Sequence, residues 1–238
     1  SKEKAYALVR PSDTLIIIPA YNEEGSIEAV VRNLEKNFQE FDYVVVNDGS
    51  KDTTSEICHR NRYNIIDLPV NLGLTGAVQT GFKYAYKMGY RQAVQFDGDG
   101  QHLPEYVGDL VAEIQKGQDC VIGSRFVSEP KNNSLRMLGN RLISWSIKLT
   151  TGQTITDPTS GMRMFNQELI KDFALNVNYT PEPDTISFLI RQGYKIKEVQ
   201  VKMLERQAGQ SYLTLSRSIK YMIHMFTSIL LIQNFRRK

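Results

Sequence analysis

Cysteine is scarce in this chain. Only Cys58 and Cys120 occur among the 238 residues. Two cysteines so far apart have neither the close spacing of a zinc site nor the density of a disulfide-stapled domain. These two classes of protein are therefore excluded. We expect two reduced thiols in a cytoplasmic protein that is stabilised by a hydrophobic core.

Long apolar runs and a strong charge of either sign are also missing. The first apolar run, Leu15–Ile18, is too short for a secretory signal. The longest uncharged stretch near the C-terminus, Tyr221–Phe235, has 15 residues, whereas a membrane span needs about 18 or more. The formal net charge is +3, which is too small by itself to indicate nucleic-acid binding. We therefore expect no secretory leader, no membrane span and no nucleic-acid partner.

The first half of the sequence alternates strand-like and helix-like segments. Short apolar or β-branched runs bounded by turn residues predict buried strands at Thr14–Ile18, Tyr43–Asn47, Asn64–Leu68, Gln92–Phe96 and Asp119–Ile122. Amphipathic periodicity predicts helices at Ser26–Phe38, Leu74–Met88 and Pro104–Lys116. This alternation favours a mainly parallel sheet that binds ligands at the carboxyl ends of its strands.

The second half has a less regular pattern. Its predicted elements are helices at Leu135–Thr151 and Pro181–Gln192, a strand at Lys195–Val201 and a terminal helix at Leu213–Phe235. No repeat or linker interrupts the chain, whose length suits one large α/β domain. We therefore predict a single Rossmann-like α/β domain over residues 1–212, followed by a C-terminal amphipathic helix over 213–238.

The clearest chemical motif is Asp97-Gly98-Asp99-Gly100-Gln101-His102, which follows an apolar strand. Two carboxylates one residue apart can converge on one hard cation when the chain bends, and the glycines permit that bend. Mg²⁺ or Mn²⁺ held in this way can bridge a diphosphate and neutralise charge as a phosphate leaves. A plain turn between strand and helix is the alternative interpretation of the same residues.

Polar residues also follow the first two predicted strands. Pro19-Ala20-Tyr21-Asn22-Glu23-Glu24 ends the first, and Asn47-Asp48-Gly49-Ser50 ends the second. An aspartate at a strand end can accept hydrogen bonds from a base or ribose, and a tyrosine can lie against a ring. Helix capping by Ser50 and dipole complementation by the glutamates are alternatives compatible with that role. Three acidic, turn-rich segments at three strand ends favour a shared ligand site.

These motifs, in this order, resemble the signatures of inverting family-two glycosyltransferases with the GT-A fold. The resemblance lies in Ile17–Glu23, Asn47–Ser50, Asn71–Gly73 and Asp97–His102. The polyprenyl-phosphate branch, which includes dolichol-phosphate mannose synthases, is resembled by Asp157–Arg163, Lys197–Val201, Arg206 and Gly209–Ser211. Tyr212 departs from that branch, whose pattern has a basic residue at this position. Similar chains also add sugars in bacterial cell-surface polysaccharide synthesis.

The resemblance implies roles for individual residues. The nucleotide-sugar donor would be bound by Pro19, Ala20, Tyr21, Glu23, Asp48, Asp97 and Gly98. A Mg²⁺ or Mn²⁺ ion would be held by Asp97, Asp99 and Gln101. Arg125 and Arg206 would meet the donor diphosphate, because a guanidinium can bind its oxygens bidentately. Without the motif context, each arginine would be interpreted as a solvated surface residue.

Three acids compete for the role of catalytic base. Glu182 stands about where the family has its acceptor-side carboxylate, and Asp157 and Asp184 are its rivals. Inverting transfer to a hydroxyl needs a carboxylate within reach of the acceptor proton, whereas a lipid phosphate is already anionic and needs none. Helix-start acids favoured by the dipole are the alternative interpretation of Glu182 and Asp184. The acceptor atom therefore stays open.

The C-terminal segment has an apolar stripe that ends in Arg236-Arg237-Lys238. Its members are Ile219, Met222, Ile223, Phe226, Leu230 and Phe235. An amphipathic helix with a basic end suits an anionic membrane surface. Packing on the domain, on a small membrane-protein partner or on a second copy of the chain would also cover the stripe.

The resemblance thus implies an inverting, metal-dependent glycosyltransferase with a UDP- or GDP-linked donor. We expect it to act peripherally at the cytoplasmic face of the membrane, on a polyprenyl-phosphate or lipid-linked saccharide acceptor. A nucleotidyltransferase is one alternative, but it usually needs a glycine-rich basic loop after the first strand, which Pro19–Glu24 lacks. A non-catalytic nucleotide-sugar-binding module is the other, and the intact Asp97, Asp99 and Glu182 argue against it.

Overall fold

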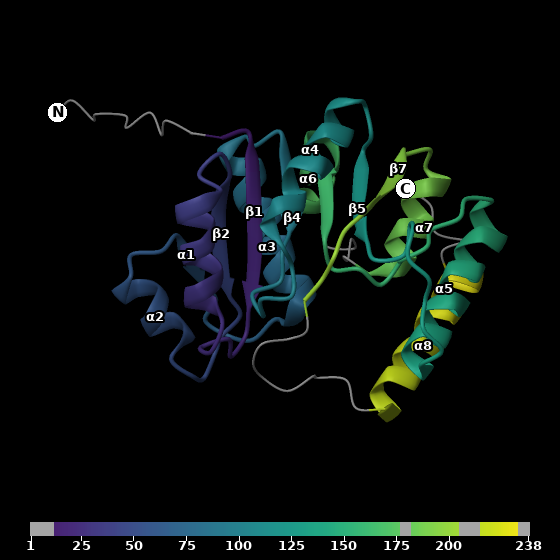
Figure 1. The fold of residues 1–238 in the computed structure, drawn as a ribbon, viewed down its shortest axis with the longest axis horizontal. Coiled ribbons are helices and arrows are strands. Elements are labelled where there is room, and N and C mark those ends of the chain that lie inside the picture. The colour runs from purple at the N-terminus through teal and green to yellow at the C-terminus, as the bar shows by residue number, and fades with distance from the viewer. Residues whose placement is uncertain (1–11, 177–181, 205–214, 233–238) are drawn as a thin grey trace.

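The computed structural model describes residues 12–176, 182–204 and 215–232. These residues form one central β-sheet with helices against both faces, which is a three-layer α/β arrangement (Figure 1). The predicted α/β class with a mainly parallel sheet is confirmed. The predicted boundary after Tyr212 lies outside the described residues.

The sheet has seven strands in the order β3-β2-β1-β4-β6-β5-β7. The strands are β1 (Thr14–Ala20), β2 (Asp42–Asn47), β3 (Ile65–Asp67), β4 (Gln92–Gln95), β5 (Cys120–Ser124), β6 (Arg163–Asn166) and β7 (Ile196–Gln200). All pairings are parallel except those of β6, which runs antiparallel between β4 and β5. The amino end of β6 therefore lies at the same edge of the sheet as the carboxyl ends of the other strands.

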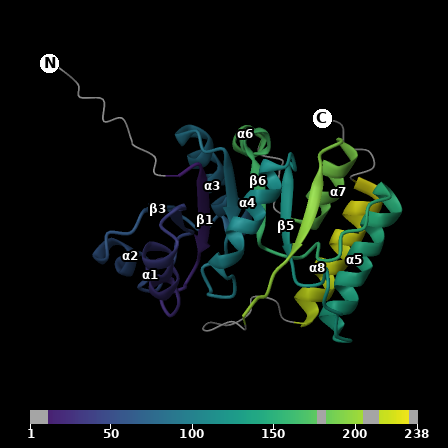
Figure 2. The same cartoon turned by 45° about the horizontal axis from the view of Figure 1, so that its top comes forward.

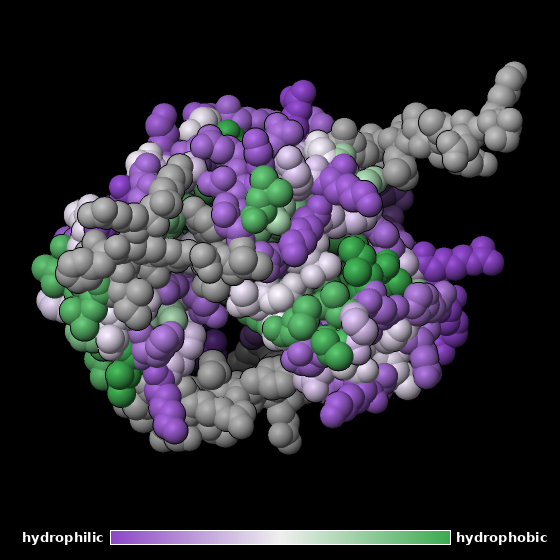
Figure 3. Space-filling model, turned by 180° about the vertical axis from the view of Figure 1, so that it is seen from behind, coloured by the Kyte–Doolittle hydropathy of each residue, from purple (hydrophilic) through white to green (hydrophobic). Residues whose placement is uncertain are grey.

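Alternate side chains of the strands enter two separate cores. In β1, Leu15 and Ile17 belong to one core and Ile16 and Ile18 to the other, as the two-residue period of a strand requires. Helices α1 (Ile27–Asn37), α2 (Thr54–Arg60) and α4 (Val107–Gln115) cover one face. The opposite face is covered by α3 (Gly73–Met88), α5 (Leu135–Thr151), α6 (Gln167–Leu175), α7 (Pro183–Arg191) and α8 (Leu215–Thr227) (Figures 1 and 2). Apolar patches nevertheless remain on the surface (Figure 3).

The first five predicted helices begin and end close to their predicted positions, whereas the α-helix in the predicted Leu213–Phe235 segment ends at Thr227. A 3₁₀ turn at Pro104–Tyr106 precedes α4, and a π-helical turn at Ser228–Ile232 follows α8. None of the helices in the described residues has the length and apolar character needed to cross a bilayer.

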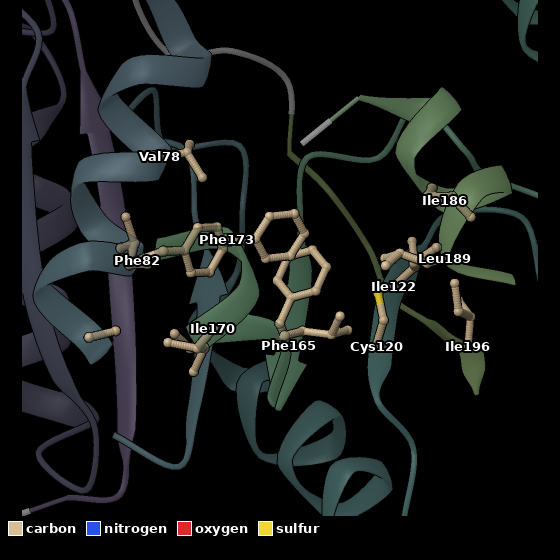
Figure 4. Close-up of a cluster of buried hydrophobic side chains, with 14 of the residues drawn as sticks. Val78, Phe82, Cys120, Ile122, Phe165, Ile170, Phe173, Ile186, Leu189 and Ile196 are labelled. Atoms are coloured by element: carbon tan, nitrogen blue, oxygen red, sulfur yellow. The ribbon is translucent and has the colours of Figure 1, made fainter. Parts of the chain in front are cut away.

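Three elements of the structure, α2, β6 and α6, were not predicted from the sequence. An aromatic cluster packs β6 and α6 against α3 (Figure 4), with ring centroids 5.0 Å apart for Phe82 and Phe173 and 4.8 Å apart for Phe165 and Phe173. β6 has only four residues and begins with Arg163. A segment that short shows no usable periodicity, so its place in the sheet depends on packing.

The C-terminal helix packs on the domain rather than standing apart from it. α8 lies beside α5 (Figures 1 and 2), and Met222 packs directly on Gly139. Met225 of α8 and Ile229 of the following turn are buried. Of the interpretations left open for this helix, packing on the domain therefore holds for its inner face. The basic end at residues 236–238 lies outside the described residues.

Candidate active site

A cavity of about 550 Å³ opens at the carboxyl ends of β1, β2 and β4. It is lined by Pro19, Ala20, Tyr21, Glu23, Asp48, Asn71, Gly73, Leu74, Ala77, Asp97, Gly98 and Asp99. All but four of these residues were predicted as site residues from the sequence. The three strand-end motifs therefore meet in one cavity, whose size is typical of a small-molecule site.

Hydrogen bonds between side chains and backbone connect the loops after β1 and β2. Asn22 adopts a φ of 55°; its Oδ1 accepts the Lys51 N–H at 2.8 Å, and its own N–H donates to Ser50 Oγ at 3.0 Å. The Glu23 N–H donates to Thr54 Oγ1 at 2.9 Å. Ser50 is therefore not the helix cap that the sequence allowed, because its hydroxyl joins the two loops instead. These hydrogen bonds between the two loops hold one wall of the cavity in place.

Asp48 is buried, and its Oδ1 accepts the Leu72 N–H at 2.6 Å. Gly49 has a φ of 66°, and a Cβ on it would lie 2.8 Å from the Asn71 nitrogen. The turn therefore needs glycine both for its backbone angle and for the close approach. Asn71–Gly73, which the resemblance singled out without a role, thus forms the wall that holds Asp48.

The acidic loop after β4 contributes two carboxylates to the cavity. Asp99 is buried, and its Oδ1 accepts the Gln101 N–H at 3.0 Å. Asp97 lies nearer to solvent, and its Oδ1 accepts Gln95 Nε2 at 3.4 Å. The Gln101 side chain does not line the cavity, and its Nε2 is 3.4 Å from the Leu204 carbonyl oxygen. Two of the three predicted metal ligands therefore share the cavity.

His102 and Gly161 lie next to the acidic loop. Buried His102 accepts the Asp97 N–H on Nδ1 at 2.9 Å, so this nitrogen carries no proton and is already engaged. A Cβ on Gly161 would lie 2.8 Å from Asp97 Oδ2. Glycine at this position lets the Asp157–Arg163 segment approach the acidic loop, and two motifs that are far apart in sequence become neighbours.

Arg125 and Asp157 form a bidentate ion pair at the carboxyl end of β5. Arg125 Nε donates to Asp157 Oδ2 at 2.8 Å and Nη2 donates to Oδ1 at 2.9 Å. Asn140 Nδ2 also donates to Oδ1 at 3.1 Å, while Glu198 Oε1 accepts the Asp157 N–H at 2.8 Å. The Asp157 side chain is fully buried and that of Arg125 is 24 % exposed. Donors therefore already engage both carboxylate oxygens of Asp157.

Glu182 and Asp184 lie at the start of α7 and bind hydroxyl groups from the C-terminal segment. Tyr221 Oη donates to Glu182 Oε2 at 2.5 Å, and Ser228 Oγ donates to Asp184 Oδ2 at 2.7 Å. Burial, together with the nearby Glu182 carboxylate, raises the pKa of Tyr221 well above its ordinary value, so the phenol keeps its proton. The position of both acids at the start of α7 agrees with the interpretation that the helix dipole favours them there. The dipole does not explain why each acid binds a hydroxyl group from the C-terminal segment.

The remaining predicted residues are not in the cavity wall. Gln101, Arg125, Asp157, Glu182 and Asp184 lie outside the set that lines it. Arg206, together with Gly209–Ser211 and Tyr212, falls outside the described residues. Within the described ranges, no group of three or more His, Cys, Asp or Glu side chains could by itself hold a metal ion.

Lys131 is a residue that sequence reasoning missed. Its Nζ donates to Asn140 Oδ1 at 2.5 Å and lies 5.6 Å from the centre of the Phe126 ring, which Arg125 also approaches at 5.0 Å. Burial lowers the pKa of Lys131. No local pattern marks this lysine in the sequence, because its partners come from a helix and a loop.

Comparison with known proteins places the chain among sugar transferases. The family model described as "Glycosyl transferase family 2" matches residues 15–173. An undecaprenyl-phosphate mannosyltransferase of Micrococcus luteus is 30% identical over 210 residues, covering 83% of this chain and 86% of that protein. A UDP-N-acetylglucosamine–dolichyl-phosphate N-acetylglucosaminyltransferase of Methanococcus voltae is 36% identical over 177 residues, covering 66% and 70%.

A solved structure has a similar fold. Glucosyl-3-phosphoglycerate synthase from Mycobacterium tuberculosis, in complex with Mn²⁺ and UDP-glucose, superposes with a TM-score of 0.66. The match covers 91% of this chain and 78% of that one, at 18% sequence identity. This likeness concerns the arrangement of the sheet and helices.

Proposed function

The chain belongs to glycosyl transferase family 2, and we propose that it is an inverting, metal-dependent enzyme acting on a polyprenyl-phosphate or lipid-linked saccharide acceptor. The observation that carries the proposal is the cavity at the ends of β1, β2 and β4, with Asp97 and Asp99 in its wall. Its position is the one where parallel α/β sheets bind ligands. The family assignment removes the nucleotidyltransferase alternative.

The donor nucleotide-sugar would occupy the cavity. Tyr21 offers a ring face for the base, and Asp48, whose Oδ1 is already held by the Leu72 N–H, offers its second oxygen to the base or ribose. Pro19, Ala20, Glu23 and Gly98 complete the predicted donor wall. UDP- and GDP-linked sugars both fit this chemistry.

Asp97 and Asp99 would hold a divalent cation, with Gln101 as the third predicted ligand. Two carboxylates in one cavity fit Mg²⁺ or Mn²⁺, since such ions are often bound through one or two carboxylates plus substrate phosphates. When bound, the ion would supply positive charge to the departing diphosphate.

Arg125 would present its guanidinium to the donor diphosphate, and Asp157 would be the residue that positions it. Both Asp157 oxygens accept hydrogen bonds from the Arg125 side chain, the Arg125 N–H also donates to Oδ2, and Asn140 Nδ2 donates to Oδ1. Asp157 is fully buried and these donors engage both of its oxygens, so we assign Asp157 to positioning rather than to the base. Arg206 stays the second proposed diphosphate contact.

The acceptor side would be formed around Glu182 and Asp184. The relatives reported above bear names that specify undecaprenyl and dolichyl phosphates, which supports a phosphate as the nucleophile. A phosphate oxygen needs no base, so Glu182 would orient the acceptor rather than accept its proton. If the acceptor is a sugar hydroxyl instead, Glu182 becomes the preferred base, with Asp184 as its rival.

A nucleotide panel tests the donor assignment directly. Thermal unfolding with Mn²⁺ should respond to one nucleotide class, because a ligand at 100 times its dissociation constant adds about 2.7 kcal/mol of stability. Transfer to undecaprenyl phosphate is then measured with the nucleotide-sugar of that class. If no nucleotide or nucleotide-sugar stabilises the protein with Mn²⁺, the cavity is not the donor site. Binding without transfer or donor hydrolysis would favour a non-catalytic module.

A further inference from the structure

The outward side of α5 carries an apolar stripe. Leu138, Leu142, Trp145 and Leu149 are between 40 and 61 % exposed. Their spacing of four, three and four residues places them on one side of the helix. Trp145 is the only tryptophan in the chain, and it is more than half exposed. A contiguous apolar surface of this kind marks an interaction site.

α8 and the turn after it add to this surface. Ile223 and Leu231 are 60 and 58 % exposed, and α8 lies beside α5. Of thirteen large apolar side chains that are exposed in the described residues, six belong to these two neighbouring segments. Figure 3 shows the molecule from behind, so the margin that carries α5 and α8 on the right of Figure 1 lies on its left. Apolar side chains gather along this margin.

The same segments carry only positive charge. Residues 135–151 contain Arg136, Arg141 and Lys148, residues 215–232 contain Arg217 and Lys220, and neither stretch has an aspartate or a glutamate. Lys148 and Lys220 are exposed. Cations around an apolar, tryptophan-bearing face match the headgroup region of an anionic bilayer, where aromatic rings lie at the interface and basic side chains meet lipid phosphates.

We propose that the outer face of α5, together with α8, docks the protein onto an anionic lipid bilayer. A second copy of the chain fits this face less well, because two such faces would bring cations together with no acid on either helix to pair with them. The bilayer supplies negative charge instead.

The inner side of α5 connects this surface to the site. Asn140 donates to Asp157 Oδ1 at 3.1 Å and to Thr159 Oγ1 at 2.8 Å, while Ile143 and Ile147 are buried in the core. A bilayer bound to the outer side of α5 would therefore lie one helix thickness from the Arg125–Asp157 pair. The use of this arrangement, delivery of a lipid-linked acceptor, rests on the proposed function; the docking itself does not.

Vesicle binding of the whole chain tests the proposal, with Trp145 as a built-in reporter. Vesicles of phosphatidylglycerol mixed with phosphatidylcholine should blue-shift the tryptophan emission and co-sediment the protein, and pure phosphatidylcholine should do so at least tenfold more weakly. Leu142→Glu should weaken partitioning about tenfold or more, because a leucine leaves the interface and a repelled charge enters it. Leu175→Glu, at a leucine on α6 that is 62 % exposed against 40 % for Leu142, is the control and should bind as wild type.

A second variant separates charge from apolar contact. Lys148→Gln combined with Lys220→Gln should weaken binding to the anionic vesicles about tenfold or more and leave binding to phosphatidylcholine unchanged. Equal binding to both lipids, equal loss in Leu175→Glu, or a dimer in light scattering that Leu142→Glu dissociates would overturn the proposal. Nucleotide binding to the cavity is measured on every variant, so a failure of docking is distinguished from a failure of the donor assignment.

Discussion

The two halves of the sheet differ in how five of their acidic side chains are held. Asp48 and Asp99, on the β1–β2–β4 side, line an open cavity and accept hydrogen bonds from backbone N–H groups of nearby loops. Asp157, Glu182 and Asp184, on the other side, bind side chains from separate elements. A backbone N–H is present whatever the neighbouring residue type, whereas an arginine or hydroxyl partner must be supplied by a particular residue.

This difference predicts which substitutions should change ligand binding and transfer, and which should change the stability of the fold. Carboxylates held by the backbone and facing a cavity can change with little cost to folding, so their loss should appear in binding and transfer. A carboxylate that neutralises a partly buried partner leaves that partner unpaired when it is removed. Substitutions on the second side should therefore appear first in stability.

Asp99→Asn is expected to have the largest effect. Loss of a carboxylate from the proposed metal site should lower transfer about a thousandfold, because the bound ion contributes several kcal/mol of charge stabilisation. The free energy of unfolding should stay close to that of wild type. Transfer by single turnover and urea unfolding measure the two quantities. Asp13→Asn, at an exposed aspartate directly before the first residue of β1, is the control and should change neither quantity. Full activity in excess chelator would contradict the assignment of the metal site.

Asp157→Ala should show the reverse pattern. Removing this buried carboxylate leaves Arg125 without its ion-pair partner, which should lower the free energy of unfolding by about 3 kcal/mol. Glu28→Ala, which breaks the exposed pair with Arg32 on α1, should cost only about 0.5 kcal/mol. Urea unfolding compares the two variants, and equal losses would show that the Arg125–Asp157 pair is not a special feature of this half.

Glu182→Gln sharpens the comparison on the acceptor side. With a polyprenyl phosphate as acceptor, no proton has to be removed, and the rate of transfer should fall less than tenfold. Single-turnover transfer with saturating donor and metal measures this, with Asp157→Asn run in parallel. A loss on the order of 10²–10⁴ would identify a hydroxyl acceptor and Glu182 as its base. Collapse of Asp157→Asn alone, with donor binding retained, would move the base to Asp157.

Tyr221→Phe should have the smallest effect, about 1 kcal/mol of stability, because it removes one hydrogen bond to Glu182. It should also change the dependence on pH. The pKa of Tyr221 is raised in the folded protein, so above about pH 10, where an unfolded tyrosine ionises, wild-type stability falls as pH rises. The variant should lose less over that range. Tyr86→Phe, at an exposed tyrosine, should follow wild type.

The sequence alone was sufficient to predict which strand-end residues line the cavity. Apolar runs that end in Asp48 or Asp97, with glycines beside them, are local signals in the sequence. Parallel strands then necessarily bring their carboxyl ends to one edge of the sheet. The cavity wall was therefore predictable from residues that are close together in the chain. Asn71–Gly73 was marked by resemblance, but its contact with Asp48 required the fold.

Tertiary structure decided the contacts of Asp157 and Glu182 on the other half of the sheet. Arg125 and Asp157 were each singled out in the sequence for separate roles, but nothing in the spacing of residues so far apart predicts that they form a pair. The insertion of β6 antiparallel between β4 and β5 brings the Asp157–Arg163 segment against Asp97. The packing of α8 on α5 brings Tyr221 to Glu182. Such contacts depend on how distant elements fill space around a common core, whereas local periodicity reports only which face of one element is buried.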